Sequence, residues 1–335
     1  MRVYEIRETR GIESITPGDR PVPQLADRQV LVRIKAVSLN YSDLSVTRGA
    51  YSRNTPLPFV LGSDGVGNVA DIGSAVTRVG RDERVALTFM PKWIQGPITE
   101  AMTRAARGRT IDGTLAEFVA VDENAVVKVP EYLSDEEAAT LPTAGLTAWN
   151  ALVSHGKLQP GEWVLTLGTG GVSLFATQFA QQIGARVIGS SGSVEKLERL
   201  RQMGLREVIN YRATPDWAKR VREVTNGGVD LIAEVGGAAT LEQSLRAVRV
   251  GGRISLIGGL GGAGAINPMP IVMKSITVQG IYVGSREMFE SMNEFLSMHR
   301  LRPVIDRTFD FDNAREAFEY LESWRHFGKV CVRVG

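Results

Sequence analysis

The sequence predicts an α/β protein in which a β-rich N-terminal part precedes a doubly wound parallel sheet. Three observations predict this fold. Short apolar runs with frequent turns precede residue 125, and apolar strands alternate with amphipathic helices after residue 125. A glycine-rich turn directly follows the first of those strands. The length of 335 residues suits two domains, at roughly 100–200 residues each. A content of 43% hydrophobic and 23% charged residues is ordinary globular composition.

The first 125 residues are expected to form short strands. Residues 30–37 alternate apolar and polar side chains over part of their length, and residues 59–71 and 83–89 are further apolar runs. Gly62, Gly65 and Gly67 interrupt the first of these two runs, and Gly80 precedes the second. This pattern favours a β-rich unit with tight turns.

The pattern of apolar and polar residues changes near residue 125. Ser134 and Glu137 have the spacing of a capping box, which marks the start of a helix. Continuous apolar strands then alternate with helices, which implies a parallel sheet covered on both faces. The handedness of the crossovers makes the sheet doubly wound. The strands are expected at 163–167, 186–189, 208–209, 229–233, 253–257 and 276–283, and the helices at 172–183, 195–203, 216–225, 239–248 and 312–323.

The turn after the strand at 163–167 has the character of a phosphate-binding turn. Gly168, Thr169, Gly170, Gly171 and Val172 approximate G-x-G-x-x-G and open a helix. Glycines permit a tight turn and a close approach of the backbone, and free N–H groups at a helix N-terminus attract anions. We therefore expect a dinucleotide pyrophosphate here. The alternative is a glycine-rich turn that only packs.

The end of the next strand indicates which dinucleotide is bound. NAD-selective folds place an acidic residue there for the ribose 2′-OH, but residues 189–193 contain no acid. Ser190, Ser193, Lys196 and Tyr211 instead supply hydroxyls and a cation for a 2′-phosphate, which predicts NADP(H). In the alternative interpretation the serines cap the next helix and Lys196 is a solvated charge; capping and phosphate binding are compatible.

Composition excludes several other classes of protein. The net charge of +2 provides no strong field for nucleic acid or an anionic membrane. The single cysteine, Cys331, excludes an intramolecular disulfide framework and a cysteine-rich zinc site. The N-terminus lacks the apolar region of a signal peptide, and the uncharged stretches 163–185 and 254–273 are broken by glycine. We expect a cytoplasmic enzyme with no nucleic-acid or membrane partner.

At these motifs the sequence resembles the medium-chain dehydrogenase/reductase superfamily over essentially its whole length. The resemblance rests on the glycine turn 168–172, on residues 141–148 (LPTAGLTA) and on residues 62–67 (GSDGVG). It is closest to the zinc-free branch with the NADPH:quinone oxidoreductases, zeta-crystallin-like proteins and zinc-lacking alcohol dehydrogenase homologues. The resemblance implies a GroES-like catalytic domain at 1–124 completed by 285–335, a Rossmann domain at 125–284, and a homodimer joined through about 275–281.

The resemblance also implies the site residues. Asn40 and Tyr51 are the expected catalytic residues: Asn40 could donate to a developing oxyanion, and Tyr51 could stack on a flat ring or donate its hydroxyl. The alternatives are an Asx-type turn at Asn40 and ordinary packing of Tyr51. Cofactor contacts are expected from Asn40 itself, from the phosphate turn and the four 2′-phosphate candidates above, and from Thr147, Val235, Ile257, Gly258, Val283 and Lys329.

Zinc-containing relatives carry Gly-His-Glu where this chain has Gly62, Ser63 and Asp64, and a zinc-ligand cysteine near Asn40. The three histidines are far apart in the sequence. No metal is therefore expected.

The expected activity is NADPH-dependent reduction of quinones or α,β-unsaturated carbonyl compounds by direct hydride transfer. Two alternatives stay open: a zinc-free NADP-dependent alcohol dehydrogenase or carbonyl reductase, and an NADPH-binding, zeta-crystallin-like protein with little turnover. The segment 91–113, with Arg104, Arg107 and Arg109, is longer than in compact quinone reductases. It is either a wall of the substrate cleft or a solvated loop.

Overall fold

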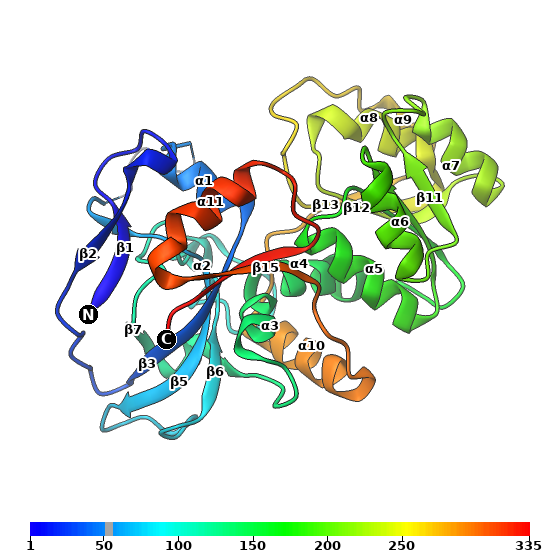
Figure 1. Ribbon diagram of the computed structural model, residues 1–335. Helices are drawn as coiled ribbons and strands as arrows, with labels where there is room; N and C mark the ends of the chain where they lie inside the picture. The colour runs from blue at the N-terminus through cyan, green and yellow to red at the C-terminus, as the bar shows by residue number, and fades with distance from the viewer. Residues whose placement is uncertain (51–55) are drawn as a thin grey trace. The chain divides into compact units, whose positions relative to one another are not determined.

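The computed structural model describes residues 1–50 and 56–335, which divide into two compact units. Unit 1 comprises Met1–Leu146 and Val283–Gly335, and unit 2 comprises Thr147–Tyr282. Figure 1 labels the elements. Among the described residues, no helix combines the length and apolar character needed to reach across a lipid bilayer.

Unit 1 is built on a sheet in the order β15-β16-β3-β5-β6-β8, with β7 also paired to β3. A smaller sheet has the order β2-β1-β4. The unit's strands are β1 (Arg2–Ile6), β2 (Ile15–Asp19), β3 (Gln29–Leu39), β4 (Phe59–Val60), β5 (Asp64–Ile72), β6 (Arg84–Leu87), β7 (Phe118–Asp122), β8 (Val126–Lys128), β15 (Ile305–Asp310) and β16 (Lys329–Arg333). Its helices are α1 (Tyr41–Thr47), α2 (Glu100–Thr103), α3 (Asp135–Ala139), α10 (Arg286–His299) and α11 (Ala314–Glu322).

The two ends of the chain meet in the middle of this sheet. Strand β16 lies between β15, to which it is parallel, and β3, to which it is antiparallel, with Val330 opposite Leu39. Apolar side chains of β3, β16 and α11 share one buried core, in which Val32, Phe318 and Val330 are fully buried. The completion of unit 1 by the C-terminal segment therefore follows from the burial of β16.

Residues 125–146, which we expected in the Rossmann domain, belong to unit 1. Strand β8 pairs with β6, and α3 packs against β3 and β5, so this stretch is held by the sheet of unit 1. The predicted capping box is present: Ser134 N donates to Glu137 Oε2 at 2.8 Å, and Glu137 N donates to Ser134 Oγ at 3.2 Å.

Unit 2 is the predicted doubly wound parallel sheet. Its strand order is β11-β10-β9-β12-β13-β14, and every pair is parallel. The strands are β9 (Trp163–Thr166), β10 (Arg186–Ser191), β11 (Glu207–Asn210), β12 (Val229–Glu234), β13 (Val248–Leu256) and β14 (Thr277–Gly280). The helices are α4 (Leu146–Trp149), which begins at the last residue of unit 1, α5 (Gly171–Ile183), α6 (Val194–Gln202), α7 (Trp217–Thr225), α8 (Ala238–Ala247) and α9 (Met269–Met273).

The strand order fixes where a ligand of unit 2 would lie. The chain leaves β9 toward β10 and β11, and later returns to the other side of β9 with β12. The carboxyl end of β9 is thus the topological switch point, where open α/β sheets bind ligands. The glycine turn 168–171 occupies this position.

Candidate active site and cofactor site

Unit 1 contains a buried polar cluster around Asn40, which follows β3. The amide of Asn40 donates from Nδ2 to Ser63 Oγ at 3.1 Å and to Asp64 Oδ2 at 2.9 Å. Its Oδ1 accepts from Lys329 Nζ at 2.7 Å. Both donors and the acceptor of the amide have partners, so its orientation is fixed.

Lys329 and Asp64 supply opposite charges inside this cluster. Lys329 is 4% exposed and Asp64 is fully buried. Burial lowers the pKa of Lys329, and the charge of Asp64 opposes that shift. Burial also raises the pKa of Asp64 to about 6, against the effects of Lys329 and of hydrogen bonds from Asn40 and Thr143. A carboxyl group whose pKa lies near neutral pH, beside a buried lysine, is typical of functional sites.

A buried ion pair between Arg109 and Asp43 adjoins the cluster. Arg109 Nη1 lies 2.8 Å from Asp43 Oδ1, and these side chains are 1% and 0% exposed. Asp43 also accepts from Ser63 Oγ at 3.1 Å and from the backbone N of Asn40 at 2.7 Å. A continuous network therefore runs from Arg109 to the Asn40 amide.

The structure brings together two residues that the sequence singled out separately, Asn40 and Lys329. It also adds two contributors that sequence reasoning missed. Arg109 was expected only as part of a wall or loop, and Thr143, whose Oγ1 donates to Asp64 Oδ1 at 2.5 Å, lies in a π-helical turn containing Pro142. The proline inside a helical pattern was the available signal for Thr143. Tyr51 lies outside the described residues.

Val283 has an unusual backbone. This buried residue has φ +53°, a region that β-branched residues rarely occupy. Strained backbone of this kind is concentrated at ligand sites. The strain supports the expectation that its backbone contacts the cofactor.

In unit 2 the glycine turn has the geometry of an anion cradle. Gly168 has φ +76°, and a Cβ at Gly168 or Gly170 would meet no atom within 4 Å. Gly170 is the N-cap of α5 and no side chain caps that terminus. The first N–H groups of α5 therefore have no capping side chain, which suits the binding of an anion such as a pyrophosphate.

The four 2′-phosphate candidates lie in different environments. Ser190 is buried; its Oγ accepts from Gly168 N at 3.2 Å and donates to Thr166 O at 3.3 Å, so it supports the turn. Ser193 Oγ accepts from Lys196 N at 3.3 Å and caps α6, and Tyr211 is exposed. The expected capping is thus present at Ser193.

Arg212 was missed in the sequence. A Cβ on Gly192 would lie 2.8 Å from Arg212 Nε and 2.9 Å from the ring of Tyr211. Both side chains therefore flank the loop after β10, where the 2′-phosphate is expected. The signal was a second cation directly after Tyr211.

The remaining cofactor candidates of unit 2 end neighbouring strands. Val235 and Gly258 follow β12 and β13, and a Cβ on Gly258 would lie 2.7 Å from Val235 O. The buried Glu234 carboxylate accepts from Gly236 N at 2.8 Å and Gly237 N at 3.1 Å, which holds the loop after β12. Ile257 is half-buried beside Gly258, and Thr147 is buried in α4. This arrangement gives a rigid edge at the carboxyl ends of the strands.

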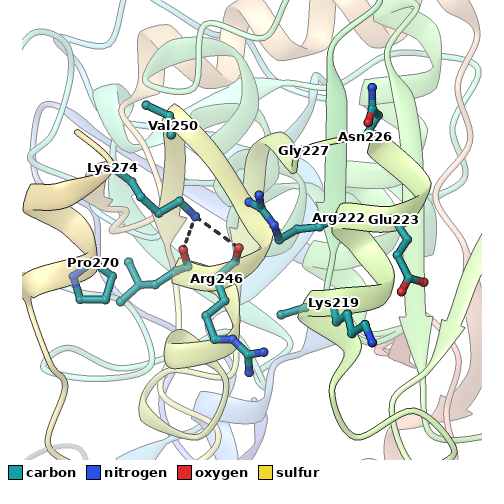
Figure 2. A pocket seen from close by; sticks show the side chains of 11 residues that line it. Lys219, Arg222, Glu223, Asn226, Gly227, Arg246, Val250, Pro270 and Lys274 are labelled. Atoms are coloured by element: carbon teal, nitrogen blue, oxygen red, sulfur yellow. Dashed lines mark hydrogen bonds between the residues drawn. The ribbon is translucent and has the colours of Figure 1, made fainter.

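Unit 2 also has a groove away from these residues. The groove has a volume of about 810 Å³. Figure 2 shows part of its lining, including Lys219, Arg222, Arg246 and Lys274. Burial and the nearby Arg222 lower the pKa of Lys274 to about 8. Its Nζ donates to the backbone carbonyl of Leu245 at 2.7 Å. Leu245 lies in the last turn of α8, so Lys274 caps the C-terminus of that helix.

The sequence comparisons agree with this architecture. Residues 26–131 match the alcohol dehydrogenase GroES-like domain and residues 171–298 match the family described as zinc-binding dehydrogenase. The zinc-type alcohol dehydrogenase-like protein C1773.06c of Schizosaccharomyces pombe is 40% identical over 98% of this chain and 97% of its own. The chain belongs to the medium-chain dehydrogenase/reductase family, whose members are oxidoreductases with nicotinamide cofactors.

Two further proteins show the range of that family. Human quinone oxidoreductase is 28% identical over 95% of this chain and 93% of its own. A crystal structure of an NAD-dependent alcohol dehydrogenase has a TM-score of 0.91 and 34% identity, with all of both chains covered. The fold of a GroES-like domain with a Rossmann-like domain is therefore confirmed.

The family name implies zinc, but the residues of this chain do not form a zinc-ligand set. Among the described residues, no group of three histidine, cysteine, aspartate or glutamate side chains is arranged to hold a metal ion. Burial raises the pKa of Cys331 to about 12, so its thiol is protonated. The Lys329 ammonium beside Asn40 would also repel a metal cation.

Proposed function

We propose that this protein is an NADPH-dependent reductase of quinones or α,β-unsaturated carbonyl compounds, acting by direct hydride transfer without a metal. The observation that carries the proposal is the buried Lys329 ammonium bonded to Asn40 Oδ1 and to Leu39 O, each at 2.7 Å. We take this amine as protonated, because Nζ donates both hydrogen bonds and the charge of Asp64 opposes the lowering of its pKa by burial; it then places a positive charge in the cluster that contains Asn40. A fixed cation and oriented amides can stabilise an oxyanion without a metal.

When bound, NADPH supplies a hydride with both electrons to the acceptor and leaves negative charge on the acceptor's oxygen. The Asn40 amide would then exchange its bond to Ser63 for one to that oxygen. Lys329 polarises the same amide through Oδ1, which strengthens Nδ2 as a donor. Asp64 holds the second N–H, so one donor stays in place while the other is offered.

The network offers no strong general acid that faces solvent, because Lys329 and Asp64 are both buried. Solvent would therefore complete the protonation of the reduced product. Positioning of the two reactants would carry most of the rate enhancement.

The cofactor preference rests on the loop after β10. No acidic residue stands there, the side chains of Tyr211 and Arg212 lie beside Gly192, and Lys196 lies in the first turn of α6, where its backbone N donates to Ser193 Oγ. A 2′-phosphate would be attracted, whereas a ribose 2′-OH would lack its usual carboxylate partner. The NAD-dependent relative favours the second candidate function, an alcohol dehydrogenase that also lacks a metal.

The assembly we propose is a homodimer joined at about residues 275–281. Strand β14 is the last in the sheet of unit 2, so its outer edge has unpaired backbone groups. Sedimentation equilibrium should give twice the mass of the chain, 36.5 kDa.

The activity is tested by NADPH oxidation against a panel of quinones, enones and aldehydes. Lys196→Ala and Arg212→Ala should each raise the KM for NADPH at least about tenfold more than that for NADH. Arg206→Ala, which removes an exposed cation at the other end of β11, is the matched control. Equal effects on the two cofactors would contradict the phosphate role.

Asn40→Ala should lower kcat more than it weakens NADPH binding, and an unchanged kcat would remove Asn40 from the mechanism. Reduction of aldehydes alone would favour the alcohol dehydrogenase. Tight NADPH binding with no turnover on any acceptor would favour a zeta-crystallin-like binding protein.

A further inference from the structure

The segment 106–114 of unit 1 is fastened to the strand that leads into the polar cluster. Gly113 N donates to Val60 O at 2.8 Å, and Thr114 N donates to Leu61 O at 3.0 Å. The approach is so close that a Cβ on Gly108 would lie 2.7 Å from the carbonyl oxygen of Gly62. The backbone at Gly108, between Arg107 and Arg109, is therefore held against Gly62 and Ser63.

Arg107 is buried in this segment with little to balance its charge. It is 4% exposed, and its Nε is buried without a hydrogen-bond partner. Its side chain makes one weak bond, from Nη1 to Asp112 O at 3.4 Å. Burial lowers the pKa of its guanidinium to about 10, so it is still a cation at neutral pH.

The nearest carboxylate is already occupied. Asp112 accepts from Arg20 Nη1 at 2.8 Å and from Val60 N at 2.9 Å. Within the described part of the chain, Arg107 forms no ion pair. Arg109, by contrast, has its charge matched by Asp43.

A buried guanidinium without a partner is costly, and an unsatisfied buried group in a folded protein needs an explanation. We propose that Arg107 anchors an anionic group, a carboxylate or a phosphate, of the hydride acceptor. This inference rests on the proposed function, because the acceptor is the molecule that the cluster around Asn40 would bind. The planar fork of donors on arginine matches both anions in bidentate geometry.

The position of Arg107 also explains the length of the segment that carries it. Arg109 reaches inward to Asp43 and organises Asn40, while Arg107 keeps donors available two residues earlier. One segment thus supplies both the support of the reacting centre and the recognition of a remote charge. Binding energy from a remote charge can be used to orient the reacting end of a substrate.

The test uses NADPH oxidation with three matched enones: 4-phenylbut-3-en-2-one, its para-carboxylate and its para-phosphate ester. Wild-type protein should have a lower KM for one of the anionic enones than for the neutral parent. Arg107→Gln should raise that KM by at least about tenfold, as expected on losing a charge-assisted hydrogen-bond pair. The KM for the neutral enone should stay within about twofold. Arg107→Lys, which keeps the charge but loses the fork, should be intermediate.

Arg104→Gln is the control, because Arg104 is an exposed arginine that lies just before the segment 106–114. It should change none of the three KM values. The inference is overturned if Arg107→Gln changes neutral and anionic enones alike, or if the wild type does not distinguish them. The preferred anion identifies the carboxylate or the phosphate as the group bound.

If no enone is reduced, calorimetry decides the inference alone; the proposed function itself fails only if quinones are not reduced either. Benzoate and phenyl phosphate are then titrated into the wild type and Arg107→Gln. Saturable binding that the variant loses supports the anchor. Equal binding by both proteins, or none by the wild type, overturns it.

Discussion

Replacing Arg109 with methionine tests whether the buried network is held by its ion pair. The change leaves the Asp43 carboxylate, which is 0% exposed, with only Ser63 and the backbone of Asn40 as donors. Removing one partner of a buried pair costs about 3–5 kcal/mol. The exposed pair of Arg104 with Glu100, at 73% and 86% exposure, should contribute under about 1 kcal/mol. Arg109→Met should therefore destabilise unit 1 several times more than Arg104→Met.

The assay is urea-dependent hydrogen exchange of peptides from unit 1, because a two-unit protein need not unfold in a single transition. The double variant with Asp43→Asn removes both charges and should recover part of the loss, which gives a coupling energy for the pair. A cost for Arg109→Met no greater than that for Arg104→Met would refute the reasoning.

Three further outcomes are expected. Gly168 and Gly161 have φ +76° and +81°, with open space around a Cβ at each position. Replacing either glycine with alanine should cost about 1 kcal/mol of stability. Only Gly168→Ala should also weaken NADPH binding, which a titration of each variant with NADPH measures. Burial raises the pKa of Asp64 from 3.8 to about 6, so the native state binds this proton more tightly than the unfolded state does. The contribution of Asp64 to the free energy of unfolding is therefore largest below about pH 4 and is lost as the pH rises from about 4 to 6. Over the same range kcat should rise, as ionised Asp64 regains its bonds from Asn40 and Thr143, and Asp64→Asn should abolish that inflection in the pH profile. Prolonged dialysis against a chelator should leave kcat within about twofold, and a stoichiometric metal whose removal abolishes activity would contradict the metal-free proposal.

The elements of unit 2 were predictable because each is a local pattern. The strand expected at 229–233 corresponds to β12 (Val229–Glu234), and the helix expected at 239–248 corresponds to α8 (Ala238–Ala247). In such units the periodicity of burial directly reflects the element that produces it. The glycine turn was visible for the same reason, since a strand, a turn and a helix follow one another in the chain.

The polar cluster could be predicted only in part. Asn40 and Lys329 were both named, but their hydrogen bond joins positions near opposite ends of the sequence, and no local pattern encodes it. Arg109 was visible as a charge, yet its partner Asp43 lies far from it in the chain. The role of Ser190 was also hidden, because a hydroxyl that supports a turn and one that faces a phosphate look the same in sequence.

The place of β16 between β3 and β15 has a consequence for how the protein forms. Residue 330 must find residue 39, and all of unit 2 lies between them in the chain. Contacts of such long sequence separation close slowly, while the sheet of unit 2 needs only its own segment. We therefore expect unit 2 to be complete first during synthesis, and Lys329 to join the polar cluster of unit 1 only when β16 pairs with β3.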